Sequence, residues 1–223
     1  GDREEVVRHV RILGTGLAVP ERKVTDVEIE KQLSLPVGWV KKTGGVETRH
    51  WVTTETAAQL GARAARMALQ HADVAAGDLD LIISAGGTEQ QPIPATAVFV
   101  QRELGLENSG IPAFDVDATC LSFLMGLDVA AQFIVGGRYK RVLVVSPDIA
   151  SCGLNPNHKE SYTILGDGAG AVVLAPSEES AILTARFNTW SSQAELCQIK
   201  GGGTYLYPTR YTPERHDDFL FQM

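Results

Sequence analysis

The sequence predicts an α/β fold in which helices cover both faces of a mostly parallel sheet. Three observations lead to this prediction. Short apolar segments alternate along the chain with longer segments of helical periodicity. The short segments are apolar throughout rather than at every second residue, which is typical of strands buried on both faces. One helical segment, residues 120–135, is apolar nearly all round, as expected for a helix buried between layers.

Strands are predicted where β-branched and apolar residues cluster between turn-forming residues. The segments with this composition are 10–17, 79–85, 113–116, 142–146, 169–174 and 182–187. Apolar spacing or length marks a short helix from about 26 to 33 and longer helices at 54–72 and 120–135. Residues 38–51 and the polar stretch after Trp190 are expected to be irregular.

Capping residues indicate where some of these helices begin and end. Thr25 is the expected N-cap of the short first helix, because Glu28 follows it at capping-box spacing. Pro94 suits the first turn of a further helix, which Gly105 would end.

Composition narrows the class of protein. The chain has 223 residues, of which 44% are hydrophobic, enough for one core or for one domain with an appendage. It carries 20 basic and 27 acidic residues, and a net charge of −7 argues against nucleic acid or an anionic membrane as a partner. The three cysteines include no C-x-x-C pair, and no metal-site spacing occurs. These features, with no signal peptide and no apolar run long enough to span a bilayer, predict a cytoplasmic location without a metal.

Two glycine clusters resemble phosphate-binding loops only superficially. ILGTGLAVP at 12–20 is followed by no helix, and ILGDGAGAVVL at 164–174 runs into a strand-like segment. A dinucleotide-binding loop has to open a helix, so phosphate binding is rejected for both clusters. The glycines are expected to allow a close backbone approach or a tight turn.

Cys120 is the main candidate for chemistry. It follows the strand-like segment AFDVD after two residues, which places its sulfur at the N-terminus of the apolar helix. The helix dipole and free N–H groups at that point favour a thiolate, the form that acts as a nucleophile. Free cysteine is also among the most often buried residue types, so position alone leaves core packing the favoured reading.

The other candidates are weaker. A cysteine nucleophile usually needs a histidine base, but His9, His50 and His71 suit a solvated surface. His158 and His216 lie in polar loops, and their spacing singles out neither. Cys152 and Cys197 lack a helix-start setting, so structural or incidental roles are favoured. Trp39, followed by two lysines, could form a nucleotide site with an aromatic face beside ammonium groups. An ordinary exposed loop with one packed tryptophan is an interpretation at least as well supported by the local sequence.

Several segments, taken in order, point to a known family. They are ILGTGLAVPERKVTD, GWVKKTGGVETRHW, LDLIISAGGTEQQPIPATAVFVQRELGL, FDVDATCLSFLMGLDVA, VLVVSPDIAS and ILGDGAGAVVL. In this order they resemble the N-terminal portion of β-ketoacyl-acyl-carrier-protein synthase III, a thiolase-like condensing enzyme. The resemblance implies one half of a duplicated αβαβα layered fold with a buried helix that bears the nucleophile. Residues 1–175 would form this half-domain, and 176–223 an irregular lid or linker leading to a second half absent from the chain.

The resemblance also implies roles for individual residues. Cys120 matches the acyl-accepting nucleophile, with its own backbone N–H as one oxyanion donor. Trp39 matches the residue that stacks on the adenine of coenzyme A. The remaining matches are Lys42 and Thr43 near the nucleotide, Lys159 at a coenzyme A contact, Ile93 at the dimer interface that floors the partner's acyl pocket, and Leu121 at the acyl channel.

The sequence departs from the family at several of these positions. The family commonly has C-[SA]-G-F where this chain has C-L-S-F, so Leu121 and Ser122 are larger than usual. Lys42 and Lys159 stand where arginines are usual, and Glu160 where a small residue is usual. A lysine cannot make the planar two-point phosphate contact of an arginine.

The implied function is that of an acyltransferase of fatty acid biosynthesis. It would condense an acyl thioester with a malonyl thioester, with loss of CO₂, through an acyl-Cys120 intermediate. Acyl-CoA and acyl-carrier protein would be its partners, no further cofactor would be needed, and it would be a homodimer. The family's catalytic His and Asn fall outside this chain. Two alternatives remain: a non-catalytic half or dimerisation module, and a cysteine hydrolase that uses His158 or His216.

Overall fold

The computed structural model describes residues 8–180 and 182–223. Contacts divide the chain into two compact units, and these do not follow a boundary at residue 175. The sheet unit takes in Gly1–Pro20, Thr53–Ile149 and Gly168–Arg186. The second unit takes in Glu21–Val52, Ala150–Asp167 and Phe187–Met223. The predicted division into 1–175 and 176–223 stays a prediction.

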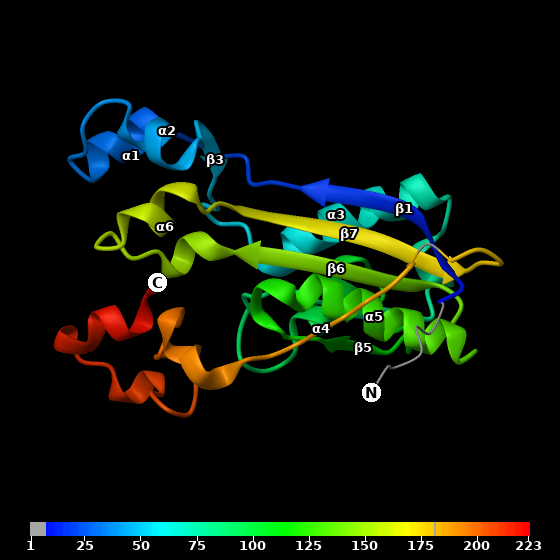
Figure 1. Cartoon of the computed structure of the whole chain (residues 1–223). Coiled ribbons are helices and arrows are strands. Elements are labelled where there is room, and N and C mark those ends of the chain that lie inside the picture. The colour runs from blue at the N-terminus through cyan, green and yellow to red at the C-terminus, as the bar shows by residue number, and fades with distance from the viewer. Residues whose placement is uncertain (1–7, 181) are drawn as a thin grey trace. The chain divides into compact units, whose positions relative to one another are not determined.

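The sheet unit is built on five strands in the order β1-β7-β6-β4-β5 (Figure 1). Their bounds are β1 Val10–Ala18, β4 Leu81–Ser84, β5 Ala113–Asp115, β6 Val142–Ile149 and β7 Asp167–Pro176. β4 is parallel to both β5 and β6, whereas β1 is antiparallel to β7. The sheet is therefore mixed, and its parallel part confirms the predicted class.

Helices cover both faces of this sheet. Gly126 of α5 (Ser122–Val135) lies so close to β6 that an added Cβ would be 3.2 Å from Val144 Cγ1. Gly61 of α3 (Ala57–Ala72) approaches Val145 in the same way, at 3.3 Å from Cγ2. Successive residues of a strand point to opposite faces, so α5 and α3 lie on opposite sides. α4 (Thr96–Glu103) packs beside α3 and completes a three-layer α/β/α arrangement.

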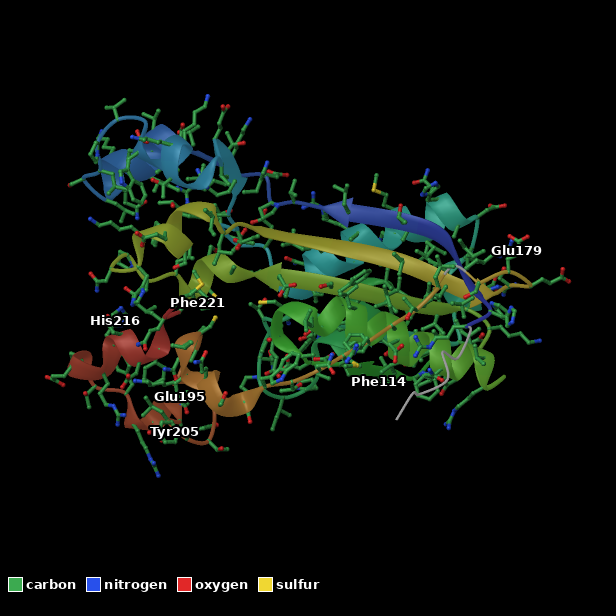
Figure 2. The ribbon with its side chains drawn as sticks, viewed as in Figure 1. Phe114, Glu179, Glu195, Tyr205, His216 and Phe221 are labelled. Carbon is green, nitrogen blue, oxygen red and sulfur yellow. The ribbon has the colours of Figure 1, made fainter. Side chains whose placement is uncertain are left out.

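The α5 helix has one buried face in this chain. Ala130, Ala131 and Ile134 belong to the core that α5 shares with β4 and β6. Figure 2 labels Phe114 of β5, whose ring meets the edge of Phe133 on α5 at 6.3 Å between ring centres. Leu124, on another side of α5, is 51% exposed. α5 is therefore buried on the side that faces the five-stranded sheet, and its burial between two layers stays a prediction.

The second unit holds the short elements β2 (Lys23–Thr25), α1 (Asp26–Gln32), α2 (Trp39–Gly44), β3 (Thr48–His50) and α6 (Lys159–Ile164). Thr25 caps α1 through its side chain, which accepts the N–H of Glu28, as predicted. The expectation that 38–51 is irregular is wrong, because α2 and β3 form there. The buried Glu30 carboxylate accepts the N–H groups of Gly38 and Val40, at the start of α2. Because Glu30 lies eight and ten residues before them, the short-range capping patterns in the sequence do not indicate this helix start.

Pro94 lies outside α4, whose first N–H groups, on Thr96 and Ala97, are bound at 2.7 Å by the Asp115 carboxylate from β5. The predicted strand at 182–187 is wrong beyond Ile182, which makes one bridge with Arg8, and Leu183 is 79% exposed. The segment after Trp190 is irregular, as expected, with 3₁₀ turns at Ser191–Leu196, Pro208–Arg210 and Pro213–Phe219.

The glycines of ILGTGLAVP allow β1 to lie directly against α3. A Cβ added to Gly16 would come within 3.0 Å of Ala64 O and Ala68 N, and one on Gly14 within 3.0 Å of Ala68 O. These atoms belong to helix backbone, which cannot rotate away. The expected close backbone approach is therefore confirmed for this cluster.

We expect Gly16→Ala to lower the free energy of unfolding by about 1–3 kcal/mol, because the added methyl group overlaps the α3 backbone. Urea denaturation measures this change. Gly170→Ala on the neighbouring strand is the matched control, since a Cβ there meets no atom within 4 Å. Equal stability losses in the two variants would contradict the close approach.

Candidate active site

Cys120 lies on a 3₁₀ turn between the carboxyl end of β5 and the first turn of α5. The turn spans Thr119–Leu121, and α5 begins at Ser122. The Cys120 side chain is exposed, which contradicts the alternative of a cysteine packed in the core. Its backbone N–H makes no hydrogen bond within the described residues. The position predicted from the sequence is thus confirmed, and the role as nucleophile stays a prediction.

The backbone beside Cys120 is held in a demanding conformation. Thr119 has φ +51°, a left-handed conformation that non-glycine residues rarely adopt. Asp117 Oδ1 accepts the Thr119 N–H at 2.8 Å. Ser122 Oγ accepts the Ala118 N–H at 2.9 Å and donates to the Thr119 carbonyl oxygen at 2.6 Å. A single hydroxyl therefore bonds to the backbone on both sides of the Ala118–Thr119 peptide, immediately before the candidate nucleophile.

Residues at the carboxyl ends of the neighbouring strands β4 and β6 support the same turn. A Cβ on Gly87, which follows β4, would lie 3.2 Å from the Thr119 carbonyl group. The Gly87 N–H donates to Asp148 Oδ1 at 2.7 Å, and Asp148 lies near the end of β6. The carboxyl ends of β4, β5 and β6 thus converge at Cys120. Sequence reasoning missed Gly87, Asp148 and the role of Ser122, because no local pattern reports these contacts.

The histidines of the sheet unit have partners other than Cys120. His9 Nδ1 lies 2.8 Å from the carbonyl oxygen of Glu178. His71 Nδ1 lies 3.3 Å from the Thr15 N–H nitrogen. Both side chains are exposed, as the sequence predicted. Neither provides a base at the Cys120 turn.

The predicted coenzyme A residues lie in the second unit, on α2 and α6, which pack against each other. Trp39 is the first residue of α2 and is partly buried against the cluster that contains Tyr162 of α6. Lys42 and Thr43 of α2 and Lys159 of α6 are exposed. Within the described residues, neither lysine forms an ion pair. These four residues therefore lie on two adjoining helices, although Trp39 and Lys159 are more than a hundred positions apart in the sequence.

Buried side chains of β3 and the residue after it join these segments. Arg49 is 5% exposed and donates to the carbonyl oxygens of Val46 and Thr163. Trp51 donates through Nε1 to the Leu165 carbonyl oxygen at 3.1 Å and meets Tyr162 edge-on. These contacts fix the start of the GDGAGA segment beside the α2–β3 segment. The coenzyme A roles themselves stay predictions.

Ile93 and Leu121, predicted for the dimer interface and the acyl channel, both belong to the sheet unit. Ile93 is 82% exposed and Leu121 is 50% exposed. Among residues 8–180 and 182–223, no three His, Cys, Asp or Glu side chains gather as metal ligands would. No helix in the same part of the chain has the length and apolar character to cross a bilayer.

Comparisons with known proteins agree with the resemblance seen in the motifs. Residues 114–191, which include Cys120, match the family described as 3-oxoacyl-[acyl-carrier-protein (ACP)] synthase III. The 3-oxopimeloyl-[acyl-carrier-protein] synthase of Brucella abortus is 38% identical over 96% of this chain and 64% of its own length. The β-ketoacyl-[acyl-carrier-protein] synthase III of Thiobacillus denitrificans is 39% identical over 86% of the chain and 60% of its own length.

Solved structures extend the similarity to the fold. The 3-oxoacyl-[acyl-carrier-protein] synthase III of Aquifex aeolicus matches with a TM-score of 0.80 at 35% identity, over 85% of this chain and 61% of its own. The enzyme of that name from Pseudomonas aeruginosa matches with a TM-score of 0.83 at 27% identity, over 97% and 65%. The predicted thiolase-like fold is confirmed. The chain spans 60–64% of the length of these two curated relatives.

We expect Ser122→Ala to destabilise the sheet unit by about 1–3 kcal/mol, because the half-buried Ala118 N–H loses its acceptor. Thermal unfolding measures the loss. Ser109→Ala is the matched control, because its hydroxyl also makes two local bonds but is exposed. The control should change stability by less than about 0.5 kcal/mol. If the two variants lose equal stability, Ser122 does not hold the turn.

Cys152 should become reactive only at high pH. Desolvation, with the Asp167 carboxylate as a second cause, raises the pKa of the Cys152 thiol above its usual value. The neutral thiol therefore persists to higher pH, and its alkylation by iodoacetamide should keep rising above the pH at which an ordinary thiol levels off. Peptide mapping by mass spectrometry at a series of pH values follows this site. In urea the curve should move to lower pH, and coinciding curves would refute the prediction.

Proposed function

We propose that this chain, similar over 96% of its length to the 3-oxopimeloyl-[acyl-carrier-protein] synthase of Brucella abortus, provides the nucleophile half of a condensing acyltransferase. One observation carries the proposal. An exposed thiol stands on a braced turn at the N-terminus of a helix, where the carboxyl ends of three parallel strands converge. Open α/β sheets bind their ligands at this end of the strands.

The first half-reaction is acyl transfer to Cys120. The thiolate attacks the carbonyl carbon of an acyl thioester, and the charge on the tetrahedral oxygen is met by the unpaired Cys120 N–H. The intermediate collapses, coenzyme A or acyl-carrier protein leaves as a thiolate that takes a proton from water, and an acyl-Cys120 thioester remains. The bracing of Thr119 by Ser122 keeps the sulfur and this N–H in a fixed relation, which lowers the reorganisation required.

The second half-reaction forms the carbon–carbon bond. A malonyl thioester loses CO₂, and the electron pair of the broken bond becomes an enolate. The enolate carbon attacks the acyl-Cys120 carbonyl, and the sulfur leaves as a thiolate. The product is a β-ketoacyl thioester, and the enzyme returns to its starting state. We assign assistance of the decarboxylation to groups in the part of the relatives' length that this chain does not span.

Coenzyme A recognition is assigned to the second unit. The partly exposed Trp39 ring offers a stacking face, and Lys42 and Lys159 offer point charges for phosphate groups. Thr43 adds an exposed hydroxyl on the same helix. We assign the chain to a cytoplasmic homodimer of fatty acid biosynthesis, with Ile93 at the interface, Leu121 at the acyl channel, and no cofactor beyond the thioester substrates.

Intact-mass measurement tests the proposal. The protein from the complete reading frame, incubated with acyl-CoA or acyl-carrier protein, should gain the mass of one acyl group. Cys120→Ala should abolish the adduct, whereas Cys197→Ala, which also removes an exposed thiol, should retain it. If the unsubstituted protein forms no adduct, the proposal is contradicted and a non-catalytic subunit is favoured. An adduct that survives Cys120→Ala would assign the acyl group to another residue.

A further inference from the structure

The sheet unit carries a depression at the opposite end of its parallel strands from the Cys120 turn. Asp80 and Lys140–Arg141 line it at the points where β4 and β6 begin, whereas Cys120 follows the carboxyl end of β5. Arg11 at the start of β1 and Ala175–Pro176 at the end of β7 also line it, and these segments are paired antiparallel. Its volume is about 630 Å³, within the range of small-molecule sites.

The rim of this depression is positively charged. Arg11, Lys140 and Arg141 are all exposed, in a chain whose net charge is −7. Within the described residues neither Arg11 nor Lys140 forms an ion pair. Arg141 lies 4.0 Å from Asp78, at the limit of an ion pair. Glu179, which Figure 2 shows pointing outward beyond β7, does not line the depression. The rim therefore holds cationic charge that the protein leaves largely uncompensated.

A clamp fixes the two adjacent cations. Asp80 Oδ2 accepts the backbone N–H groups of Lys140 and Arg141, each at 2.8 Å. The Asp80 N–H donates to the Arg141 carbonyl oxygen at 2.9 Å. The Asp80 carboxylate, the only acidic group among the lining residues, is thus engaged with backbone donors. On Lys140 and Arg141 the clamp engages main-chain N–H and C=O groups alone, so neither cationic side chain is used by it and both can bind an anion from a fixed backbone.

The floor of the depression is aliphatic. β1 has a bulge between Ile12 and Gly14, so Leu13 has no direct partner on β7. A bulge re-aims the side chain of its extra residue, and Leu13 lines the depression together with Ala72 and Val74 at the end of α3. No aromatic side chain is among the lining residues, so the floor offers no ring on which a nucleotide base could stack.

We propose that this depression binds an amphiphilic anion, with a carboxylate or phosphate head group held by Arg11, Lys140 and Arg141 and an aliphatic chain over Leu13 and Val74. The charge of the rim selects the head group, and the absence of an aromatic surface selects the aliphatic body. The site lies apart from Cys120, and the proposal does not rest on the proposed function.

Titration calorimetry with octanoate and octyl phosphate tests the proposal. Both probes should bind, and the double variant Lys140→Gln/Arg141→Gln should weaken each by at least about tenfold, as expected for two lost charge-assisted contacts. The substitutions spare the main-chain clamp, so the fold should be retained, and circular dichroism verifies this. Arg11→Gln, on an exposed edge strand, is a second variant and should weaken binding about threefold or more.

Arg186→Gln is the matched control, because it removes one exposed positive charge from the same unit without touching the lining. It should leave both affinities within twofold. Equal weakening by Arg186→Gln and Arg11→Gln would show a general charge effect and overturn the site. Octanoate binding that persists in the double variant would place the probe elsewhere, for example near Cys120, and would also overturn it.

Two further probes separate the head group from the chain. Inorganic phosphate should bind more weakly than octyl phosphate, because it cannot cover the floor, and octyl glucoside should not bind, because it lacks charge. Equal affinity for inorganic and octyl phosphate would overturn the aliphatic part of the proposal. Binding of octyl glucoside that survives the double variant would overturn the anionic part. A preference for octanoate or for octyl phosphate identifies the head group.

Discussion

The burial of β4 and β6 on both faces is the constraint on which the sheet unit depends. Leu81, Ile82 and Ile83 of β4 are fully buried, as are Val144 and Val145 of β6. A strand with apolar side chains on both faces is stable only if each face is covered. α5 covers one face and α3 the other. The parallel pairing that results brings the carboxyl ends of β4, β5 and β6 together, which is where Cys120 lies.

The contacts of the two covering helices differ in kind. α3 reaches β1 through glycines, so backbone touches backbone at Gly14 and Gly16. α5 uses Gly126 for a similar approach to the side chains of β4 and β6, and it begins at the turn that carries Cys120. Any shift of α5 on the sheet would therefore move the turn. The packing of α5 on the sheet therefore also fixes the position of the Cys120 thiol.

Ser122 shows how one side chain changes the local physics. A glycine at this position would offer no hydroxyl. Here the hydroxyl bonds to the backbone on both sides of the Ala118–Thr119 peptide, where Thr119 holds an unfavourable left-handed conformation. Strain of this kind persists only where neighbouring contacts enforce it. The Thr119 carbonyl group also lies close to Gly87, so the turn is braced both by α5 and by the segment that follows β4.

The sequence by itself determined the layer pattern, the position of Cys120 before an apolar helix, and the rejection of both glycine clusters as phosphate loops. Each follows from the order of neighbouring residues: continuous apolar segments, a strand followed by a helix, or a glycine cluster followed by no helix. Only the tertiary structure decided the helix at 39–44, the exposure of Cys120 and the bracing of its turn. Glu30, Asp115, Gly87 and Asp148 act on residues that lie 8 to 61 positions away. The basic depression likewise combines β1, the end of α3, β7 and the residues just before β4 and β6, and no pattern in one stretch of the sequence indicates such convergence.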